Sequence, residues 1–338
     1  MIFEFTAALH FDFITDFSKK YHIPLRDNYL TIPASMGEGY IRMVVFGNDF
    51  RLLIHRYTLK EDFIIKRNAA VEPNDLLSIF FYNNEQPLDL VYNEEQPVKF
   101  SQKNESAIQV TTNDLSSVIR FPANTETQYV VVGITSSKLM SLLGAEKPNQ
   151  VLQTITTGAT SFLYFESMNT ETQQALKNIA AINMNDDLSN FLVQIKVQEL
   201  LYHLFHRLSK RGNTSQNAVN NADAEKLFKA RDIILADISA PPLLPTLAAA
   251  IGMSETKLKQ LFKQTFGDTI YNYYQKVRME EAAFLLKQAG YSVSEVGYQL
   301  GFSNLSHFSR SFAARYGAPP SRFREIGRKA QASAPGGG

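Results

Sequence analysis

The sequence predicts a multidomain α+β protein, in which an N-terminal antiparallel β domain and some helices precede a C-terminal all-α domain. Short β-rich runs separated by turn residues occupy most of the first 165 positions, as is typical of an antiparallel domain. A polar stretch follows near position 211, and the pattern beyond it is helical. With 338 residues, 44% hydrophobic and 20% charged, the chain is long enough for roughly two domains with separate cores.

The residue composition excludes several classes of protein. The chain has no cysteine, which excludes a disulfide framework, a thiolate nucleophile and Cys-ligated zinc, and which fits a reducing compartment. No uncharged apolar run reaches the roughly 18 residues that a membrane span needs. The N-terminal segment carries Glu4 and Asp12 in its apolar stretch and has no basic leader, so no secretory signal is expected. We therefore expect a cytoplasmic protein with no membrane partner.

The β domain is predicted over residues 1–168. The runs at 40–46 and 50–59 flank Gly47-Asn48-Asp49, and two β-rich runs around such a turn indicate a hairpin. Further expected elements are strands at 75–82, 116–121 and 128–134 and a short helix at 136–143. Many short strands without intervening helices are typical of an antiparallel sandwich or barrel.

Residues 169–210 are predicted to form a helical packing or dimerisation segment. Thr170 and Gln173 fit a capping box for a helix that ends near Ala181. A second helix is expected from Asp187 to about Lys210, with its apolar residues on one face: Leu188, Phe191, Leu192, Ile195, Leu201, Leu204, Phe205 and Leu208. Two interpretations remain open, because this face can pack on its own β domain or pair in part with the same helix of a second chain.

Two segments have the composition of flexible chain. Residues 211–223 are polar, contain Val219 as their one large apolar residue, and predict a linker. Residues 330–338 contain no core-forming side chain and predict a disordered tail. The linker separates the β-rich part from a helical domain expected at 224–329.

Charge is distributed unevenly between these parts. The chain has a net charge of +1, but from Asp223 onward it holds 15 Lys/Arg and 10 Asp/Glu, a net of +5. Residues 1–222 hold the other 19 basic and 23 acidic residues, a net of −4. A basic C-terminal third suggests a polyanionic partner, although such an excess also arises by chance.

The helical domain contains an internal repeat. The segments 247–267 and 296–317 each read as a short apolar helix, then Gly-apolar-Ser, then a helix with large apolar residues four apart. Gly252 corresponds to Gly301, and Ser254 to Ser303. A glycine that turns the chain and a serine that caps the next helix predict a helix-turn-helix in each copy.

The outer face of each second helix is predicted to contact DNA in the major groove. The polar residues on these faces are Thr256, Lys257, Lys259, Gln260 and Lys263 in the first copy and Ser306, His307, Ser309 and Arg310 in the second. Gln260 suits adenine and Arg310 suits guanine, whereas Lys263 and Arg315 are expected to contact phosphates. The simpler interpretation of each residue is a solvated helix face.

One long helix is expected between the two copies. The segment 270–289 has an apolar stripe, and about 20 helical residues span roughly 30 Å. This length would place the two recognition helices about one DNA turn apart, roughly 34 Å, on one side of the duplex.

These features resemble the AraC/XylS family of transcription regulators over residues 226–329. The ending GAPPSRFRE, with Pro320, Phe323 and Arg324, is similar to the family signature, except that Pro319 stands where Ser or Thr is usual. The resemblance implies a DNA-binding domain with two helix-turn-helix motifs that acts at promoters as a sequence-specific regulator. It adds Asn304 and Leu305 to the second recognition helix and admits RNA polymerase as a further partner.

For the N-terminal domain the resemblance implies a small cupin-like barrel that binds an effector or mediates dimerisation. The histidines His10, His22 and His55 are far apart and form no metal motif, and no catalytic motif occurs, so we expect neither a metal, nor a cofactor, nor an enzyme. The candidates to hold an anionic effector are Arg42, Arg51, His55 and Arg56. The alternative is a ligand-independent regulator whose N-terminal domain serves only dimerisation or protein contacts.

Overall fold

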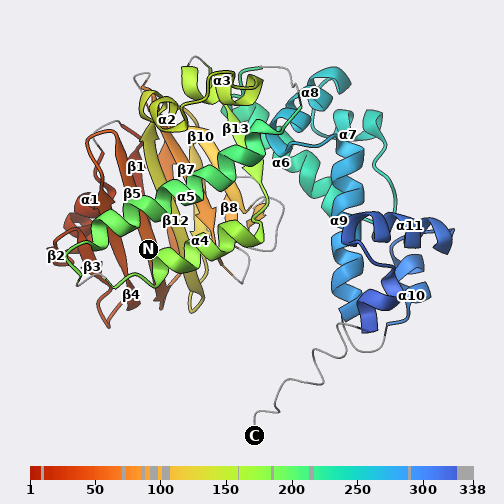
Figure 1. Ribbon diagram of the computed structural model, residues 1–338, viewed down its shortest axis with the longest axis horizontal. Coiled ribbons are helices and arrows are strands. Elements are labelled where there is room, and N and C mark those ends of the chain that lie inside the picture. The colour runs from red at the N-terminus through yellow and green to blue at the C-terminus, as the bar shows by residue number, and fades with distance from the viewer. Residues whose placement is uncertain are drawn as a thin grey trace, which may run out of the picture. The chain divides into compact units, whose positions relative to one another are not determined.

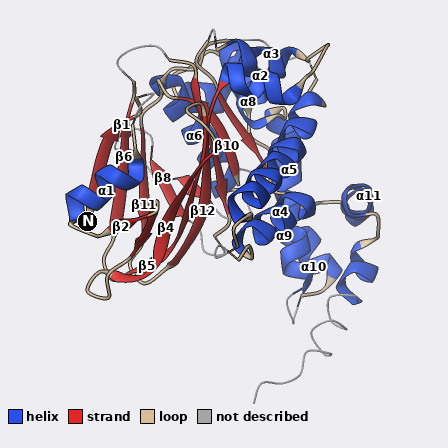
Figure 2. Ribbon diagram, turned by 60° about the vertical axis from the view of Figure 1, so that its left-hand side comes forward, coloured by secondary structure: helices blue, strands red, loops and turns tan. Residues whose placement is uncertain are grey.

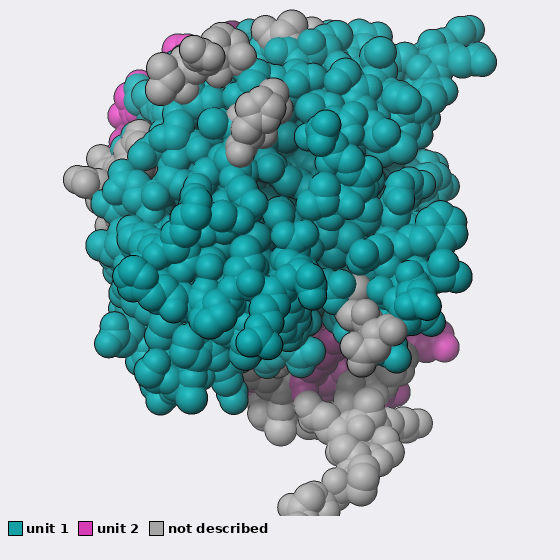
Figure 3. Space-filling model, turned by 90° about the vertical axis from the view of Figure 1, so that its left-hand side faces the viewer, with its two compact units in different colours: residues 1–228, 260–267 teal, residues 229–259, 268–338 magenta. Residues whose placement is uncertain are grey.

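The computed structural model describes residues 1–8, 11–70, 74–84, 88–91, 98–100, 107–158, 160–183, 186–212, 217–287 and 291–325. The chain forms two compact units, shown in different colours in Figure 3. The first contains Met1–Phe228 together with Gln260–Gly267, and the second contains Lys229–Lys259 and the chain from Asp268 onward. The tail predicted at 330–338 lies outside the described residues.

Two β-sheets make up most of the first unit (Figure 2). The smaller sheet has the order β1-β6-β11-β8-β9, and the larger has the order β13-β10-β7-β12-β5-β4-β3-β2. The strands are β1 (Ile2–Thr6), β2 (Leu25–Arg26), β3 (Tyr29–Thr31), β4 (Gly37–Val45), β5 (Phe50–Leu59), β6 (Phe63–Asn68), β7 (Leu76–Tyr82), β8 (Leu88–Val91), β9 (Val98–Phe100), β10 (Ile108–Thr112), β11 (Ser117–Phe121), β12 (Glu126–Thr135) and β13 (Leu163–Glu166).

The predicted antiparallel β class is confirmed, with one correction. The strand pairs are antiparallel except for β1 and β6, which run parallel. Among the described strands, neither sheet closes on itself, because the smaller ends at β1 and β9 and the larger at β13 and β2. The expected cupin-like barrel is therefore two open sheets, between which the chain crosses repeatedly.

Both faces of the larger sheet are covered, which explains its apolar strands. In β5, the residues Phe50, Leu52 and Ile54 are buried in the core against helices, while Arg51 and His55 point to the opposite face. The predicted hairpin pairs β4 with β5 through the turn at 47–49. Alternation with period two places one set of side chains on each face of the sheet.

Helices of the first unit cover one face of the larger sheet (Figure 1). They are α2 (Ser136–Leu143), α3 (Gln150–Thr157), α4 (Thr170–Ala180) and α5 (Ser189–Ser209). Helix α1 (Phe13–Tyr21) lies on the other side of this sheet, where the Phe13 ring is 5.2 Å from the His55 ring. The cap of α4 differs from the prediction: Asn169, not Thr170, accepts a hydrogen bond from the Thr172 N–H, at 2.9 Å.

The apolar residues of α5 divide into two faces, which corrects the single face predicted from the sequence. The buried face contains Val193, Val197, Leu200, Leu201, Leu204, Phe205 and Leu208. Leu188, Phe191, Leu192 and Ile195 are exposed instead, with 68% of Leu188 and 62% of Phe191 accessible to solvent. The buried face of α5 packs on the β domain of its own chain, which is the first interpretation. The exposed face is the side that the second interpretation, pairing with a second chain, requires.

The helical part of the chain continues from α6. Its helices are α6 (Asn221–Ala236), α7 (Leu244–Ala250), α8 (Glu255–Phe266), α9 (Ile270–Lys287), α10 (Val293–Gln299) and α11 (Leu305–Tyr316). Helix α6 begins inside the stretch predicted as a linker, and residues 213–216 of that stretch lie outside the described residues. In the part of the chain that the structure describes, every helix is too short or too polar to cross a lipid bilayer.

The core of the second unit joins α9, α10 and α11. Phe308 and Phe312 of α11 are fully buried in it beside Leu286 and Val296. The C-terminal signature belongs to the same core, because the Phe323 ring lies 5.3 Å from the Phe312 ring. The signature therefore packs against the buried face of α11 and completes the core of the second helix-turn-helix.

Candidate nucleic-acid interface and ligand cavity

Helices α7 and α8 form the first predicted helix-turn-helix. Gly252 adopts a φ of 61° at the turn, and the Ser254 hydroxyl accepts a hydrogen bond from the Lys257 N–H, at 3.4 Å. Leu258, Leu261 and Phe262 are fully buried, as their spacing predicts. The outer edge bears the exposed residues Thr256, Lys257, Lys259 and Gln260, whereas Lys263 is half-buried.

Lys259 and Gln260 have partners within the chain. The Lys259 ammonium lies 3.9 Å from the Glu255 carboxylate, one helical turn earlier. The Gln260 side-chain oxygen accepts a hydrogen bond from the Asn217 side chain, at 3.2 Å. The first edge is therefore polar and accessible, but part of it already contacts the chain that follows α5.

Helices α10 and α11 form the second helix-turn-helix. Gly301 has a φ of 73°, and a Cβ there would lie 1.9 Å from the Ser239 carbonyl oxygen, so only glycine fits this turn. The cap of α11 is Asn304, whose side chain accepts hydrogen bonds from Ser306 N–H at 2.9 Å and His307 N–H at 3.2 Å. Ser303, the counterpart of Ser254 in the repeat, is thus displaced from the cap by the extra residue.

The predicted residues of α11 divide by exposure. Ser306, His307 and Arg310 are exposed, and Ser309 is half-buried. Leu305 is half-buried because its side chain packs over Gly297, where an added Cβ would lie 2.6 Å from it. Among the described residues, Arg310 has no hydrogen bond or ion pair, so its guanidinium is available to a partner outside the chain.

Arg315, the predicted phosphate contact, pairs with the Glu280 carboxylate of α9. Burial raises the pKa of Glu280, and the neighbouring Arg315 and Lys276 oppose that rise. Burial also lowers the pKa of Lys276 to about 8. Lys276 and Arg315 line a groove between α9 and α11 that also contains His307. Arg315 therefore serves the packing of α11 on α9 in the free protein.

A cavity of about 110 Å³ lies between the two sheets of the first unit. Its walls come from both sheets and from the segment before α1, and they are mainly apolar and aromatic. The residues that contribute rings or long apolar chains are Phe5, Phe11, Phe13, Met43, Leu53, Ile65, Leu76, Phe80, Ile119, Tyr129 and Val131. Its size is comparable to cavities that hold a single aromatic ring.

Two of the four predicted effector residues line this cavity. The half-buried Arg51 donates a hydrogen bond to the Phe11 carbonyl at 2.8 Å, and burial lowers its pKa. His55 is 1% exposed and stacks on the Tyr129 ring at 4.1 Å between centroids. Its buried Nδ1 has no hydrogen-bond partner in the part of the chain that the structure describes, and burial lowers the pKa of His55 to about 3.

The other two candidates lie elsewhere. Arg56 points outward and lies 3.7 Å from the Glu126 carboxylate, and Arg42 is not among the cavity-lining residues. Arg67 of β6, which was not predicted from the sequence, also lines the cavity, is 4% exposed and donates a hydrogen bond to the Leu115 carbonyl at 3.0 Å. The alternating run FIIKRN was the signal for this strand.

Among the described residues, no group of three or more His, Cys, Asp or Glu side chains could hold a metal ion. The cavity thus offers cations, a neutral imidazole and hydroxyl groups to a ligand, but no paired carboxylates. Such a set suits binding of an apolar molecule with an anionic group more than acid–base chemistry.

Comparison with known proteins identifies the tandem motif. Residues 247–326 match a family model described as a helix-turn-helix domain. This match confirms the resemblance of the C-terminal domain to the AraC-type DNA-binding domain. The match covers the two motifs and the Phe323 signature, which packs against α11 of the second motif.

Relatives of the AraC-type domain are regulators by name. The transcriptional regulator CdhR of Pseudomonas aeruginosa is 39% identical over 87 residues, which cover 25% of this chain and 26% of that protein. The transcriptional activator RhaR of Escherichia coli is 28% identical over 132 residues, or 39% of this chain and 47% of that protein. The chain thus matches less than half of the length of either relative.

A solved structure also covers this domain. The transcriptional regulator with an AraC-type DNA-binding domain from Chromobacterium violaceum is 32% identical, covers 35% of this chain and 100% of that one, and has a TM-score of 0.30.

Proposed function

We propose that this protein is a sequence-specific DNA-binding transcription regulator. The observation that carries the proposal is the pair of capped helices α8 and α11, each with a buried apolar face and an exposed polar edge that contains Lys, Gln or Arg. Arg310 is the strongest candidate to read a base, because its guanidinium is exposed and can bond guanine in a bidentate manner. Double-stranded promoter DNA is the proposed partner, with RNA polymerase as a second partner at the promoter.

The experiment is DNA binding on promoter fragments across a salt series. Affinity should fall steeply as salt rises, because bound phosphates release counterions. The double variant Gln260→Ala/Arg310→Ala should lose specific affinity and relax base preference at two positions, each by about 1–3 kcal/mol. Arg26→Ala removes an exposed charge from the N-terminal domain and serves as the control. Unchanged specific affinity in the double variant would disprove the assignment of these helices.

We further propose that a small molecule in the cavity of the N-terminal domain modulates this activity. The molecule would be of about single-ring size, with an apolar body against the phenylalanines and an anionic group beside Arg51 and Arg67. Coupling between two sites of this kind is typically about 1–3 kcal/mol, or roughly 5- to 150-fold in affinity. The alternative, a regulator that needs no ligand, predicts that no metabolite changes the thermal stability of the protein.

We propose that two chains pair through α5. Its exposed apolar residues Leu188, Phe191, Leu192 and Ile195 are spaced by three and four, and Tyr202 follows Ile195 by seven residues on the same side of the helix. A second copy of the chain would present the same stripe, as a two-fold interface requires. Dimerisation would bring four recognition helices to a pair of half-sites, with α8 and α11 of each chain entering successive major grooves.

A further inference from the structure

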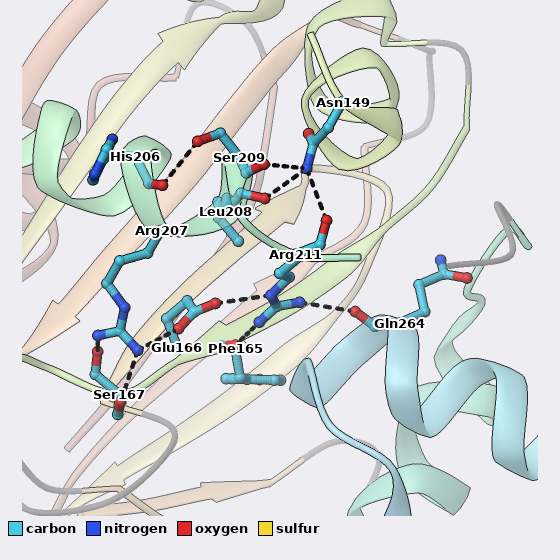
Figure 4. A network of polar contacts seen from close by, with 10 residues as sticks. All are labelled: Asn149, Phe165, Glu166, Ser167, His206, Arg207, Leu208, Ser209, Arg211 and Gln264. Carbon is cyan, nitrogen blue, oxygen red and sulfur yellow. Dashed lines mark hydrogen bonds and ion pairs between the residues drawn. The ribbon is translucent and has the colours of Figure 1, made fainter. Parts of the chain in front are cut away.

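Helix α8 is divided between the two compact units. Its first part, up to Lys259, groups with the second unit, but Gln260–Gly267 groups with the N-terminal unit. Gln260–Gly267 groups with the N-terminal unit because this part of α8 contacts the strand β13 and the segment after α5. Arg211 lies at the centre of these contacts, and its side chain is only 7% exposed (Figure 4).

The Arg211 guanidinium uses each of its three nitrogens on a different acceptor. Nε donates to the Glu166 carboxylate at 2.8 Å, Nη1 donates to the Gln264 carbonyl at 3.0 Å, and Nη2 donates to the Phe165 carbonyl. The Gln264 carbonyl is among the last four of α8, which lack a partner within the helix. A cation at this end of a helix also compensates the negative pole of its dipole. Arg211 therefore caps α8 and joins it to β13.

Further hydrogen bonds hold the backbone of Arg211 and the Glu166 carboxylate to which its side chain binds. Its backbone carbonyl accepts a hydrogen bond from the Asn149 side chain at 3.2 Å, and the same amide group bonds the Leu208 and Ser209 carbonyls at the end of α5. The second oxygen of Glu166 accepts a hydrogen bond from Arg207 at 2.7 Å. Because its carboxylate partner and its backbone are both held, Arg211 cannot follow α8 if the helix moves.

A second contact reaches the predicted DNA-reading edge. The Asn217 N–H donates to the Gln264 side-chain oxygen at 3.1 Å, and the Gln264 amide donates to the Asn217 carbonyl at 2.8 Å. The Asn217 side chain then donates to Gln260, one turn earlier on α8. Gln264 is 1% exposed, so this end of the helix is buried rather than in solvent.

Aromatic packing supports the same arrangement. The Phe266 ring at the end of α8 lies 5.7 Å from the Phe165 ring of β13 and 6.0 Å from the Phe228 ring. Gly267 follows with a φ of +81°, and a Cβ there would lie 3.0 Å from the Arg211 guanidinium. The chain therefore leaves α8 directly against the arginine.

We propose that Arg211 is a positioning residue for DNA recognition, which fixes the C-terminal part of the first recognition helix to the N-terminal domain. The position of Gln260–Gly267, and with it the base contact of Gln260, is then set by β13. The consequence at DNA rests on the proposed function. The consequence for the helix itself depends only on the contacts of Arg211.

The test compares Arg211→Ala with Arg207→Ala in the full chain. Both arginines bind Glu166, but Arg207 bonds Ser167 where Arg211 bonds Gln264, so Arg207→Ala removes a similar charge without releasing α8. Amide hydrogen exchange in residues 263–267 should become about tenfold faster or more in Arg211→Ala, because a charge-assisted hydrogen bond that restrains the helix is lost. Arg207→Ala should exchange there at the wild-type rate.

The second readout is base preference along a bound operator. Arg211→Ala should lose preference at the positions read by α8 and retain it at those read by α11, which a general loss of stability would not produce. If wild-type protein bound no DNA specifically, the proposed function would fail, yet the exchange rates would still decide the role of Arg211.

A third variant covers the case in which Arg211→Ala does not fold. Arg211→Lys keeps a positive charge beside Glu166. The lysine ammonium is compact and cannot donate to all three acceptors that the planar guanidinium reaches, so faster hydrogen exchange in α8 is again expected. Wild-type exchange at 263–267 in the folded Arg211 variants, or equal acceleration in Arg207→Ala, would overturn the proposal.

Discussion

The Arg278 guanidinium lies over the Phe302 ring, with its central carbon 3.6 Å from the ring centroid, and its Nε donates a hydrogen bond to the Leu300 carbonyl at 2.6 Å. Arg278 belongs to α9, whereas Leu300 and Phe302 belong to the turn between α10 and α11. The buried Arg278 side chain thus connects α9 to the turn that orients α11, the second recognition helix.

Replacing Arg278 with alanine should destabilise the second unit by about 3 kcal/mol, because a charge-assisted hydrogen bond and a buried cation–π contact are both lost. Urea unfolding followed by circular dichroism, with hydrogen exchange in 293–316, measures this effect. Arg322→Ala removes an exposed arginine and should change the free energy of unfolding by no more than about 0.5 kcal/mol. Equal stability of the two variants would show that the Arg278 contacts contribute little.

His55 should make the stability of the N-terminal domain depend on pH. Its pKa in the folded chain is about 3, because burial excludes the charged form, whereas an unfolded histidine has a pKa of roughly 6.5. Below pH 6.5 the unfolded chain gains a proton that the folded chain does not. The free energy of unfolding therefore decreases by up to about 1.4 kcal/mol per pH unit as pH falls from 6.5 towards 3, and this contribution vanishes above 6.5.

The measurement is urea unfolding at pH 7.5 and pH 5.5. Between these values the wild type should lose about 1.4 kcal/mol more than His55→Phe, which keeps a ring against Tyr129 but cannot bind a proton. His307→Asn removes an exposed histidine and should retain the wild-type dependence. The same pH dependence in His55→Phe and wild type would contradict the prediction.

The exposed stripe of α5 should be needed for dimerisation and not for folding. Phe191→Glu/Ile195→Glu places two carboxylates on a face that is already in solvent, so the thermal midpoint should change little, whereas apolar pairing with a second chain should be lost. Sedimentation velocity should show a dimer for wild type and a monomer for the variant. Asn190→Glu adds a charge on an exposed residue of the same helix outside the stripe and should remain dimeric. A double variant that sediments as wild type does would remove α5 from the interface.

Local signals predicted the elements that local residues determine. The turn at 47–49 fixes the β4–β5 hairpin, and Gly252 and Gly301 fix the turns of the two helix-turn-helix motifs, because each requires a backbone conformation that few residues adopt. The faces of α5 could not be assigned in this way. The helix is apolar on both sides, and only packing against the larger sheet decides that Val193 is buried and Phe191 is not.

Long-range contacts explain what remained hidden in the sequence. Arg211 stands at the start of a polar stretch with the composition of a linker, and its partners Glu166 and Gln264 are 45 and 53 residues away. The cavity likewise depends on two sheets facing each other, so that Arg67 of one and Arg51 of the other reach the same space. The alternation of residues within a strand predicts on which face of the sheet each side chain lies. It does not predict which other element packs against that face.

Arg51 should decide whether the cavity prefers anionic ligands. A ligand that binds only the folded chain stabilises it by about 2.7 kcal/mol at 100 times its dissociation constant, which a thermal-shift screen detects. Small aromatic carboxylates should raise the midpoint of the wild type more than their neutral amides do. Arg51→Met keeps an apolar wall but removes the cation, and should lose the preference for the carboxylate. Arg56→Met changes the next arginine of β5, which pairs with Glu126 on the outer side, and should behave as wild type. A carboxylate that stabilises Arg51→Met as strongly as wild type would place the anionic group elsewhere, and Arg67 would then be the residue to replace.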